Sequence, residues 1–405
     1  MDQDLIIVGA GLAGASAAEA LRDSGFEGSV TIVGTEDEAP YIRPPLSKEF
    51  LAGSAEEDSP YVHPREWYAE RSIGLEAGVT AVDLDLGGHG LVLDDGRRLK
   101  YDRLLLATGA VPRRLTIPGA ELPGVHYLRT FGDSRELKSL ISGGGRKVAI
   151  VGAGWIGLEV ASTARSLGNE VTVIGMEDIP LAAIVGERIG EVFASLHREH
   201  GVELRMSTRT SRIAGDGQAT GVVLESGETV PADVVVVGIG AVPSTGLAEK
   251  AGLEVDNGIL VDQTLRTSDP DVFAAGDVAN ELHPVLGRRI RVEHWANALN
   301  QGQAAGQSMA GQQVSYDRVP YFYTDQFDLG MEYSGYPGAA KGELVVRGDL
   351  ASREFIAFWL DDGRVAAGMN VNVWDVNPAI EELIRSGRRV DAGRLANADI
   401  PLEGL

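Results

Sequence analysis

The apolar positions near the start of the chain predict a strand, a helix and a second strand in succession. Asp4 to Val8 is mostly apolar, Ala13 to Ser24 has the composition of a helix that ends before Gly25, and Ser29 to Val33 is again apolar. A short buried strand, a helix stopped by glycine and another strand are typical of a βαβ unit with parallel strands. We therefore expect an α/β fold.

The same pattern returns in the middle of the chain. Lys147 to Val151 predicts a strand, the next segment predicts a helix to Leu167 that Gly168 ends, and Glu170 to Ile174 predicts another strand. No other internal repeat is evident. The duplication predicts two doubly wound, Rossmann-like domains.

A glycine-rich turn follows the first strand of each unit. The two turns are Gly9-Ala10-Gly11-Leu12-Ala13-Gly14 and Gly152-Ala153-Gly154-Trp155-Ile156-Gly157. In such a turn the first glycine permits a tight bend, the second lets the backbone approach a pyrophosphate, and the third lets helix and strand pack closely. Either turn alone is also compatible with a structural loop, but the strand, helix and strand around both favour two bound dinucleotides. Two such cofactors in one chain indicate an electron-transfer enzyme.

The remaining patterns indicate how the domains are arranged. The first unit is expected to run to about residue 105, and Pro231 to Gly240 to close the second as another strand entering a glycine turn. Helices are predicted near Asp133 to Ile141 and His294 to Met309. The expected domains are a first nucleotide-binding domain of residues 1–108 and 241–315, an inserted second one of residues 109–240, and a C-terminal α+β domain of residues 316–405.

Hairpin signals mark the C-terminal domain. Glu343 to Arg347, Glu354 to Leu360 and Val365 to Val371 predict strands, with the turn Asp361-Asp362-Gly363 between the last two. Pro378 lies in the first turn of a helix predicted to run to about Arg385. These elements support the α+β assignment.

Composition excludes several classes of function. The 405 residues include 36 basic and 59 acidic side chains, which give a formal net charge of −23, and no cysteine. The acidic balance disfavours binding to nucleic acid. Without cysteine the chain has no redox-active disulfide, no thiolate metal ligand and no iron–sulfur cluster of its own. Electrons from a bound redox cofactor are therefore expected to pass directly to an external acceptor.

We expect no association with a membrane. No apolar stretch approaches the roughly 18 residues of a membrane span. The first strand starts by Asp4, which leaves no room for a signal peptide, so a cytoplasmic location is expected.

One loop carries a specific family resemblance. Pro40-Tyr41-Ile42-Arg43-Pro44-Pro45-Leu46-Ser47-Lys48 resembles the Y-x-R-P-P-L-S-K signature of the ferredoxin reductases that serve oxygenases, the rubredoxin and putidaredoxin reductase family. Other matches are shared more widely among flavoproteins that bind two nucleotides: Ala107 to Gly109, Ala275 to Asp277, Glu293-His294-Trp295 and Pro320 to Gln326. The resemblance spans nearly the whole chain and implies a glutathione-reductase-like flavoprotein architecture.

The resemblance implies FAD in the first domain and a nicotinamide nucleotide in the inserted one. The residues expected to contact these cofactors are Gly9, Gly11, Leu12, Ala13, Gly14, Glu36, Arg43, Pro45, Lys48, Ala107, Thr108, Gly109, Arg129, Gly152, Gly154, Trp155, Ile156, Gly157, Glu159, Glu177, Gly240, Gly276, Asp277, Glu293, His294, Trp295 and Tyr323.

Three of the implied FAD contacts involve polar or charged groups. Glu36 would bind a ribose hydroxyl of FAD, as an acidic residue after the second strand often does. Asp277 would bind the ribityl chain, although a helix-capping aspartate is the alternative. The helix that begins at His294 and Trp295 would direct its N-terminus at the pyrimidine edge of the flavin. Trp295 is equally compatible with a core position, and His294 with a structural one.

Lys48 and Glu159 are the residues that we expect to act in catalysis. By resemblance, Lys48 would lie near N5 of the isoalloxazine, where a cation makes electrons on the flavin less costly. A buried lysine requires a carboxylate, and Glu159 is the implied companion, facing the nicotinamide. The alternatives are a surface lysine in a proline-rich loop and an acid in the first turn of a helix, stabilised by the helix dipole.

Two departures from the family pattern bear on specificity. The family often has tryptophan where Tyr321 and Tyr323 stand. At the end of the second strand of the second unit, where an acidic residue usually selects NADH, the chain has Gly175. Glu177 and Asp178 follow closely and no arginine is near in sequence, so NADH is expected rather than NADPH.

The resemblance predicts the reaction and its partners. A hydride would pass from NADH to FAD, and the electrons would then go singly to an iron–sulfur ferredoxin that serves a cytochrome P450 or a Rieske-type oxygenase. The protein is expected to be a monomer or weak homodimer. The alternatives are an NADH oxidase or quinone reductase and an NADH-sensing flavoprotein similar to apoptosis-inducing factor.

Overall fold

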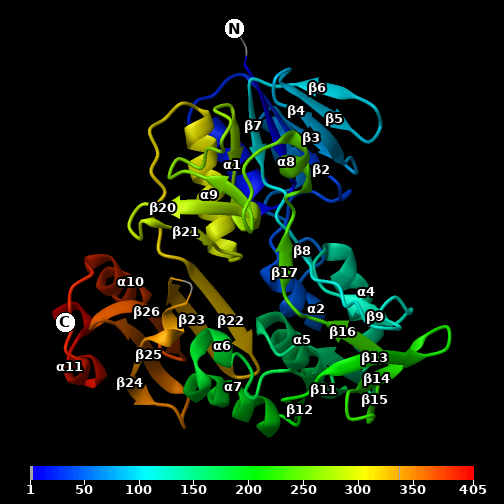
Figure 1. Ribbon diagram of the computed structural model, residues 1–405, viewed down its shortest axis with the longest axis vertical. Helices are drawn as coiled ribbons and strands as arrows, with labels where there is room; N and C mark the ends of the chain where they lie inside the picture. The colour runs from blue at the N-terminus through cyan, green and yellow to red at the C-terminus, as the bar shows by residue number, and fades with distance from the viewer. Residues whose placement is uncertain (1–2, 337) are drawn as a thin grey trace. The chain divides into compact units, whose positions relative to one another are not determined.

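The computed structural model describes residues 3–336 and 338–405, which form two compact units (Figure 1). Unit 1 contains the described part of Met1–Ile42 together with Asp58–Val111 and Val242–Pro320. Unit 2 contains Arg43–Glu57, Pro112–Ala241 and Tyr321–Leu405. The signature loop is thus divided, because its residues from Arg43 onward belong to unit 2.

Unit 1 is built on a parallel sheet with the strand order β19-β7-β1-β2-β3. Its strands are β1 (Asp4–Val8), β2 (Ser29–Gly34), β3 (Ile73–Ala77), β7 (Arg103–Leu106) and β19 (Val272–Ala274). The central strands are buried and apolar on both faces, as a sheet covered by helices requires. These elements confirm the expected doubly wound α/β fold.

Two helices of unit 1 approach each other unusually closely. They are α1 (Leu12–Asp23) and α9 (Trp295–Met309). A Cβ added at Gly302 would lie 2.4 Å from the carbonyl oxygen of Ala13, and one at Gly306 would lie 2.4 Å from that of Ala17. Only glycine allows this approach, so the glycines of α9 set the distance between the helices.

Unit 1 also contains two small sheets that the sequence pattern did not reveal. One is antiparallel, made of β4 (Ala81–Asp85), β5 (Gly90–Leu93) and β6 (Arg98–Lys100), and interrupts the segment that we expected to complete the first unit. The other joins β18 (Ile259–Val261), β20 (Ala279–His283) and β21 (Arg288–Arg291). The pattern of Thr267 to Val278 predicts one strand, but the structure has only the short strand β19 there, followed by the 3-10 turn η2 (Gly276–Val278). The helices α3 (Arg65–Glu70) and α8 (Gly246–Ala251) complete the unit.

Unit 2 repeats the parallel architecture in its nucleotide lobe, residues 43–57 and 112–241. Its sheet has the order β12-β11-β10-β16-β9 and is parallel throughout. The elements of this lobe are η1 (Pro44–Ser47), α2 (Glu49–Ala52), β9 (Val125–Tyr127), α4 (Phe131–Ile141), β10 (Lys147–Val151), α5 (Trp155–Ser166), β11 (Glu170–Ile174), α6 (Ala182–Val185), α7 (Glu187–Glu199), β12 (Glu203–Arg205) and β16 (Val234–Val237), with an antiparallel sheet of β13 (Thr210–Gly215), β14 (Ala219–Leu224) and β15 (Thr229–Pro231).

The C-terminal lobe of unit 2, residues 321–405, is a five-stranded antiparallel sheet with the order β22-β23-β26-β25-β24. Its elements are β22 (Tyr321–Gln326), β23 (Leu329–Gly335), η3 (Ala339–Lys341), β24 (Glu343–Asp349), β25 (Glu354–Asp361), β26 (Arg364–Val371), α10 (Asn377–Ser386), α11 (Ala392–Ala396) and η4 (Leu402–Gly404). The sequence pattern found three of the five strands. It missed β22 and β23 as strands.

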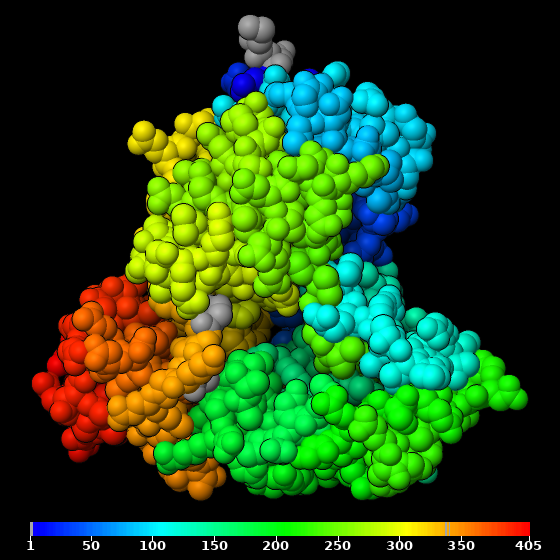
Figure 2. Space-filling model, in the orientation of Figure 1, coloured from blue at the N-terminus to red at the C-terminus, as the bar shows by residue number. Residues whose placement is uncertain are grey.

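One hydrophobic core joins the two lobes of unit 2. It includes Val148 and Phe193 of the nucleotide lobe and Met331 and Phe355 of the C-terminal lobe. Figure 2 shows the green surface of the nucleotide lobe adjoining the orange surface of the C-terminal lobe. The lobes therefore pack as parts of one unit.

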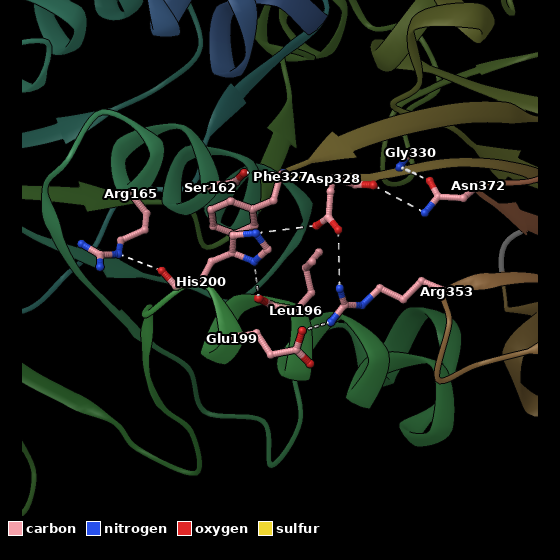
Figure 3. Close-up of polar contacts among 10 residues, drawn as sticks. All are labelled: Ser162, Arg165, Leu196, Glu199, His200, Phe327, Asp328, Gly330, Arg353 and Asn372. Atoms are coloured by element: carbon pink, nitrogen blue, oxygen red, sulfur yellow. Dashed lines mark hydrogen bonds and ion pairs between the residues drawn. The ribbon is translucent and has the colours of Figure 1, made fainter.

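The turn between β22 and β23 holds the lobes together at the edge of this core (Figure 3). The ring of Phe327 stacks on His200 at a centroid distance of 4.0 Å, and the Phe327 N–H donates to Ser162 Oγ at 2.8 Å. Arg353 of the C-terminal lobe pairs with Glu199 of α7 and lies 3.7 Å from Asp328. Phe327 has a φ of +54°, a backbone region that a bulky residue rarely adopts.

Candidate cofactor sites and a buried ion pair

The first glycine turn has the geometry that a pyrophosphate requires. A Cβ at Gly9, whose φ is +125°, would lie 2.1 Å from the Ala107 carbonyl oxygen, and one at Gly14 would lie 2.0 Å from that of Gly9. A Cβ at Gly11 would meet no atom of the described residues within 4 Å. The first and third glycines are thus required by packing, whereas the second borders open space at the N-terminus of α1, where phosphate binds favourably.

The second turn repeats this arrangement. A Cβ at Gly152 would lie 2.2 Å from the Gly238 carbonyl oxygen, and one at Gly157 would lie 2.1 Å from that of Gly152. At Gly154 a Cβ would again meet nothing within 4 Å in the described chain. Gly238 was missed by the sequence analysis, which named Gly240 instead. Aligning Ala107-Thr108-Gly109 with Gly238-Ile239-Gly240 would have revealed it, because Gly238 faces Gly152 as Ala107 faces Gly9.

Glu36 lies beside the first glycine turn. Tyr41 forms a β-bridge with Gly11, and its hydroxyl donates to Glu36 Oε2 at 2.7 Å. The Tyr41 hydroxyl therefore orients the carboxylate that we expect to bind a ribose. Sequence reasoning treated Tyr41 only as part of the signature loop.

The other residues predicted for FAD in unit 1 lie on neighbouring elements. The Gly276 N–H donates to Gln301 Oε1 at 2.9 Å, and a Cβ at Gly276 would lie 3.1 Å from that of Ala13. Asp277 lies within η2, whose N-cap is Ala275, so the helix-capping alternative was wrong. The Thr108 hydroxyl donates to the Ser244 carbonyl at 2.8 Å, next to Gly109.

The helix that we expected to face the flavin begins at Trp295, with His294 as its N-cap. Glu293 pairs with Arg291 just before it. The indole N–H of Trp295 is buried and has no hydrogen-bond acceptor among the residues that the structure describes. A buried donor without an acceptor is costly, so this position suits a ligand with an acceptor atom.

A carboxylic acid is buried behind the Gly276 turn. Gln301 Nε2 donates to Glu281 Oε2 at 3.0 Å, so Gln301 links the acid to the Gly276 backbone. Burial raises the pKa of Glu281 to about 8. Sequence analysis gave no signal for this group.

The structure pairs Lys48 with Glu159 in unit 2. Lys48 Nζ lies 3.2 Å from Glu159 Oε1, and the side chains are 10% and 4% exposed. Lys48 Nζ also lies 5.3 Å from the centre of the Tyr323 ring, within range of a cation–π interaction. The surface-lysine alternative was therefore wrong.

Glu159 lies in the second turn of α5, and the first turn contains no acidic residue. Our placement of Glu159 in the first turn was thus wrong, and the helix dipole is a weak reason for this residue because its effect falls off within that turn. Two hydroxyls and Lys48 contact the carboxylate: Thr324 Oγ1 donates to Oε1 at 2.6 Å, and Ser47 Oγ donates to Oε2. Neither hydroxyl was named from the sequence.

The loop that carries Lys48 is fixed to the nucleotide lobe by its backbone. Ser134 Oγ of α4 donates to the Leu46 carbonyl at 2.7 Å, and Thr163 Oγ1 of α5 donates to the Ser47 carbonyl at 2.8 Å. Arg43 donates to the carbonyl of Arg129, and Pro45 is buried. These contacts hold Lys48 against α5.

Several residues predicted for the nicotinamide nucleotide lie around α5. The Trp155 side chain packs edge-on against Phe193 and Phe322, each at 5.3 Å, whereas Ile156 is exposed. Glu177 is exposed beyond β11. The backbone N–H of Gly175 donates to the carbonyl of Arg205, an arginine that is distant in sequence and whose guanidinium pairs with Glu203 and Glu228. Arg205 is thus near the strand end but already neutralised.

Two glycine turns suited to dinucleotides and a buried lysine–glutamate pair define a class of protein, the oxidoreductases that bind two dinucleotides. The chain belongs to the pyridine nucleotide-disulphide oxidoreductase family, whose model matches residues 3–302, and a reductase C-terminal domain matches residues 321–405. No helix in residues 3–336 and 338–405 is long and apolar enough to cross a membrane.

The relatives agree with the predicted resemblance. The chain is 38% identical over 402 residues to rhodocoxin reductase of Rhodococcus erythropolis, covering 98% of this chain and 93% of the relative. It is 40% identical to the ferredoxin–NAD(+) reductase component of the anthranilate 1,2-dioxygenase system of Burkholderia cepacia, covering 98% of each. Among solved structures, the covalent putidaredoxin reductase–putidaredoxin complex matches with a TM-score of 0.95 and 34% identity, over 99% of this chain and 97% of that one.

Proposed function

We propose that this protein is an FAD-dependent NADH:ferredoxin reductase. The observation that carries the proposal is the pair of glycine turns, each with two glycines required by packing and a middle one bordering open space. Two relatives that match over nearly their whole length are named a rhodocoxin reductase and a ferredoxin–NAD(+) reductase component, and these names support the choice of acceptor. Bound in the site formed by the first glycine turn, FAD would supply the chemistry that links a two-electron hydride donor to a one-electron acceptor.

The residues of the chain are proposed to bind and orient the cofactors. In unit 1, the turn Gly9 to Gly14 would hold the pyrophosphate of FAD, with Glu36 at a ribose and the Trp295 N–H offering a donor. In unit 2, the turn Gly152 to Gly157 would hold NADH. Lys48, paired with Glu159, would supply the positive charge that favours reduction of the flavin.

The acceptor is proposed to be an iron–sulfur ferredoxin that serves a cytochrome P450 or another oxygenase. Because the chain has no cysteine, it offers no thiol relay, and electrons must leave the cofactor for a separate molecule. We propose a monomer or weak homodimer as the working form.

A stepwise assay tests this function. Purified protein is mixed anaerobically with NADH or NADPH, and flavin bleaching is followed by stopped flow. Oxidised ferredoxins and, separately, oxygen or a quinone are then added. We expect faster reduction by NADH and ferredoxin-dependent reoxidation. Rapid reoxidation by oxygen or quinone alone would identify an oxidase or quinone reductase, and a long-lived reduced complex with NAD would favour the NADH-sensing alternative.

A further inference from the structure

A chain of hydrogen bonds in unit 2 runs from the Lys48–Glu159 pair into the core that joins the lobes. Thr324 Oγ1 contacts Glu159 Oε1 at 2.6 Å, and Gln326 Nε2 contacts Thr324 Oγ1 at 3.2 Å. Gln326 Oε1 contacts His197 Nε2 at 2.9 Å. Thr324, Gln326 and His197 are each no more than 1% exposed. The C-terminal lobe thus contributes two residues that connect the nucleotide lobe's glutamate with its buried histidine.

The chemistry of the donor and acceptor groups fixes the direction in which each of these hydrogen bonds is donated. A hydroxyl has a single proton, so Thr324 donates to the carboxylate of Glu159 only if its oxygen accepts from its other neighbour. The amide nitrogen of Gln326 supplies that donor. With the Gln326 amide reversed, two acceptors would flank the Thr324 hydroxyl and only one could receive its proton. The network itself therefore supports the amide orientation.

His197 completes the direction at the far end. Gln326 Oε1 is an acceptor, so His197 Nε2 must carry a proton and donate it. Burial lowers the pKa of His197 to about 4, which makes the ring neutral at neutral pH. Its Nδ1 is buried and has no hydrogen-bond partner among the described residues, which suits the unprotonated nitrogen. Every donor in the chain thus points toward Glu159.

We propose that Thr324, Gln326 and His197 are positioning residues, whose directional hydrogen bonds fix the orientation of the Glu159 carboxylate toward Lys48. The inference rests on the proposed function, because its consequence is a faster reduction of the flavin by NADH. The Thr324 hydroxyl adds a donor on the same oxygen that Lys48 contacts, while Ser47 serves the other oxygen. Loss of Thr324 would leave Oε1 with Lys48 alone.

The test compares Thr324→Val, which removes the hydroxyl with little change of shape, with Thr324→Ser, which keeps it. We expect Thr324→Val to retain FAD but to slow flavin reduction by NADH about tenfold, the effect of losing one hydrogen bond to a charged group. The dissociation constant for NADH should change less than about twofold, so the loss should fall on the rate and not on binding. Thr324→Ser should restore the wild-type rate.

A double-mutant cycle separates positioning from packing. On a Glu159→Gln background, Thr324→Val should change the rate by less than about twofold, because the charged acceptor is already absent. Gln326→Glu, nearly identical in shape, replaces the amide donor by an acceptor that competes for the Thr324 proton, so it should slow reduction as Thr324→Val does. Each variant is compared at full FAD occupancy.

Two results would overturn the proposal: a wild-type rate of flavin reduction in Thr324→Val, or an equal slowing by Thr324→Val with and without the Glu159 carboxylate. The assay contains NADH and holoprotein but no ferredoxin. If the wild-type flavin is not reduced by NADH, the proposed function fails instead. If the flavin is reduced by NADH but no ferredoxin reoxidises it, the inference about the hydrogen-bond series is still decided by the rates of flavin reduction in these variants.

Discussion

Gly11 and Gly154 are the residues at which the two nucleotide sites are tested separately. Their φ values of −96° and −83° suit alanine, and a Cβ at either meets no described atom within 4 Å. Their neighbours Gly14 and Gly157 would instead clash with backbone oxygens. The middle glycines are therefore free to vary as far as folding is concerned and are restricted only by a ligand.

Gly11→Ala is expected to fold but to lose FAD, because the methyl group occupies the space where the pyrophosphate approaches. Gly154→Ala should keep FAD and weaken NADH binding at least about tenfold. The flavin-to-protein ratio and NADH titration measure both, and each variant is the control for the other. Normal binding in both variants would contradict the assignment of these turns.

Lys48→Ala is expected to retain FAD and to slow flavin reduction. It also leaves the Glu159 carboxylate buried without its cation, which should lower the free energy of unfolding by about 3 kcal/mol. Lys250→Ala, which removes an exposed lysine that pairs with Asp83, is the control and should change neither quantity measurably. Stopped-flow reduction and chemical denaturation distinguish the two effects, and unchanged reduction kinetics would remove Lys48 from the mechanism.

At the scale of elements, the hairpin of β22 and β23 couples the two lobes of unit 2. β22 presents Thr324 and Gln326 to the nucleotide lobe, and the turn after it places Phe327 on His200. The same strand therefore supports the ion pair and fastens the lobe that carries it. Strain at Phe327, with its φ of +54°, is tolerated because the ring is held by stacking.

Phe327→Asn tests this coupling. Asparagine accepts a positive φ more readily than phenylalanine, so the turn should survive while the stacking on His200 is lost. We expect a loss of about 1–2 kcal/mol in stability and faster amide exchange in the β22–β23 hairpin. Asp328→Asn, which removes the charge that lies near Arg353 and His200 but keeps the stacking, is the comparison that measures the contribution of these ion pairs separately. Equal stability of Phe327→Asn and wild type would show that the stacking contributes nothing.

At the scale of the whole molecule, two buried groups predict opposite dependences of stability on pH. The pKa of Glu281 is raised to about 8, so its contribution is full below its unfolded pKa and is lost as pH rises through about 8. The pKa of His197 is lowered to about 4, so its contribution is present above its unfolded pKa and is lost as pH falls through about 4. The two effects oppose each other between about pH 4.5 and 6.5, so the free energy of unfolding should decline mainly as pH rises from about 6.5 to about 8.

Glu281→Gln keeps an acceptor for Gln301 but cannot ionise, so it should remove most of the alkaline decline. Denaturation between about pH 6 and pH 9 measures this, with holoprotein at fixed FAD concentration. Glu254→Gln, which changes an exposed acid in the same unit, serves as control. An alkaline decline of wild-type size in Glu281→Gln would mean that another group causes it.

Local patterns along the chain were sufficient to predict both βαβ units, both glycine turns and the absence of any thiol chemistry, because a βαβ unit is encoded within a few tens of consecutive residues. Short strands such as β4 to β6 and β22 escaped, since their apolar positions are few and are buried by distant partners. The Lys48–Glu159 pair was inferred from resemblance, whereas its supports Thr324, Gln326 and His197 carry no motif of their own. They become a site only when folding brings strand β22 against α5 and α7, and contacts between such distant segments leave no local pattern in the amino-acid order.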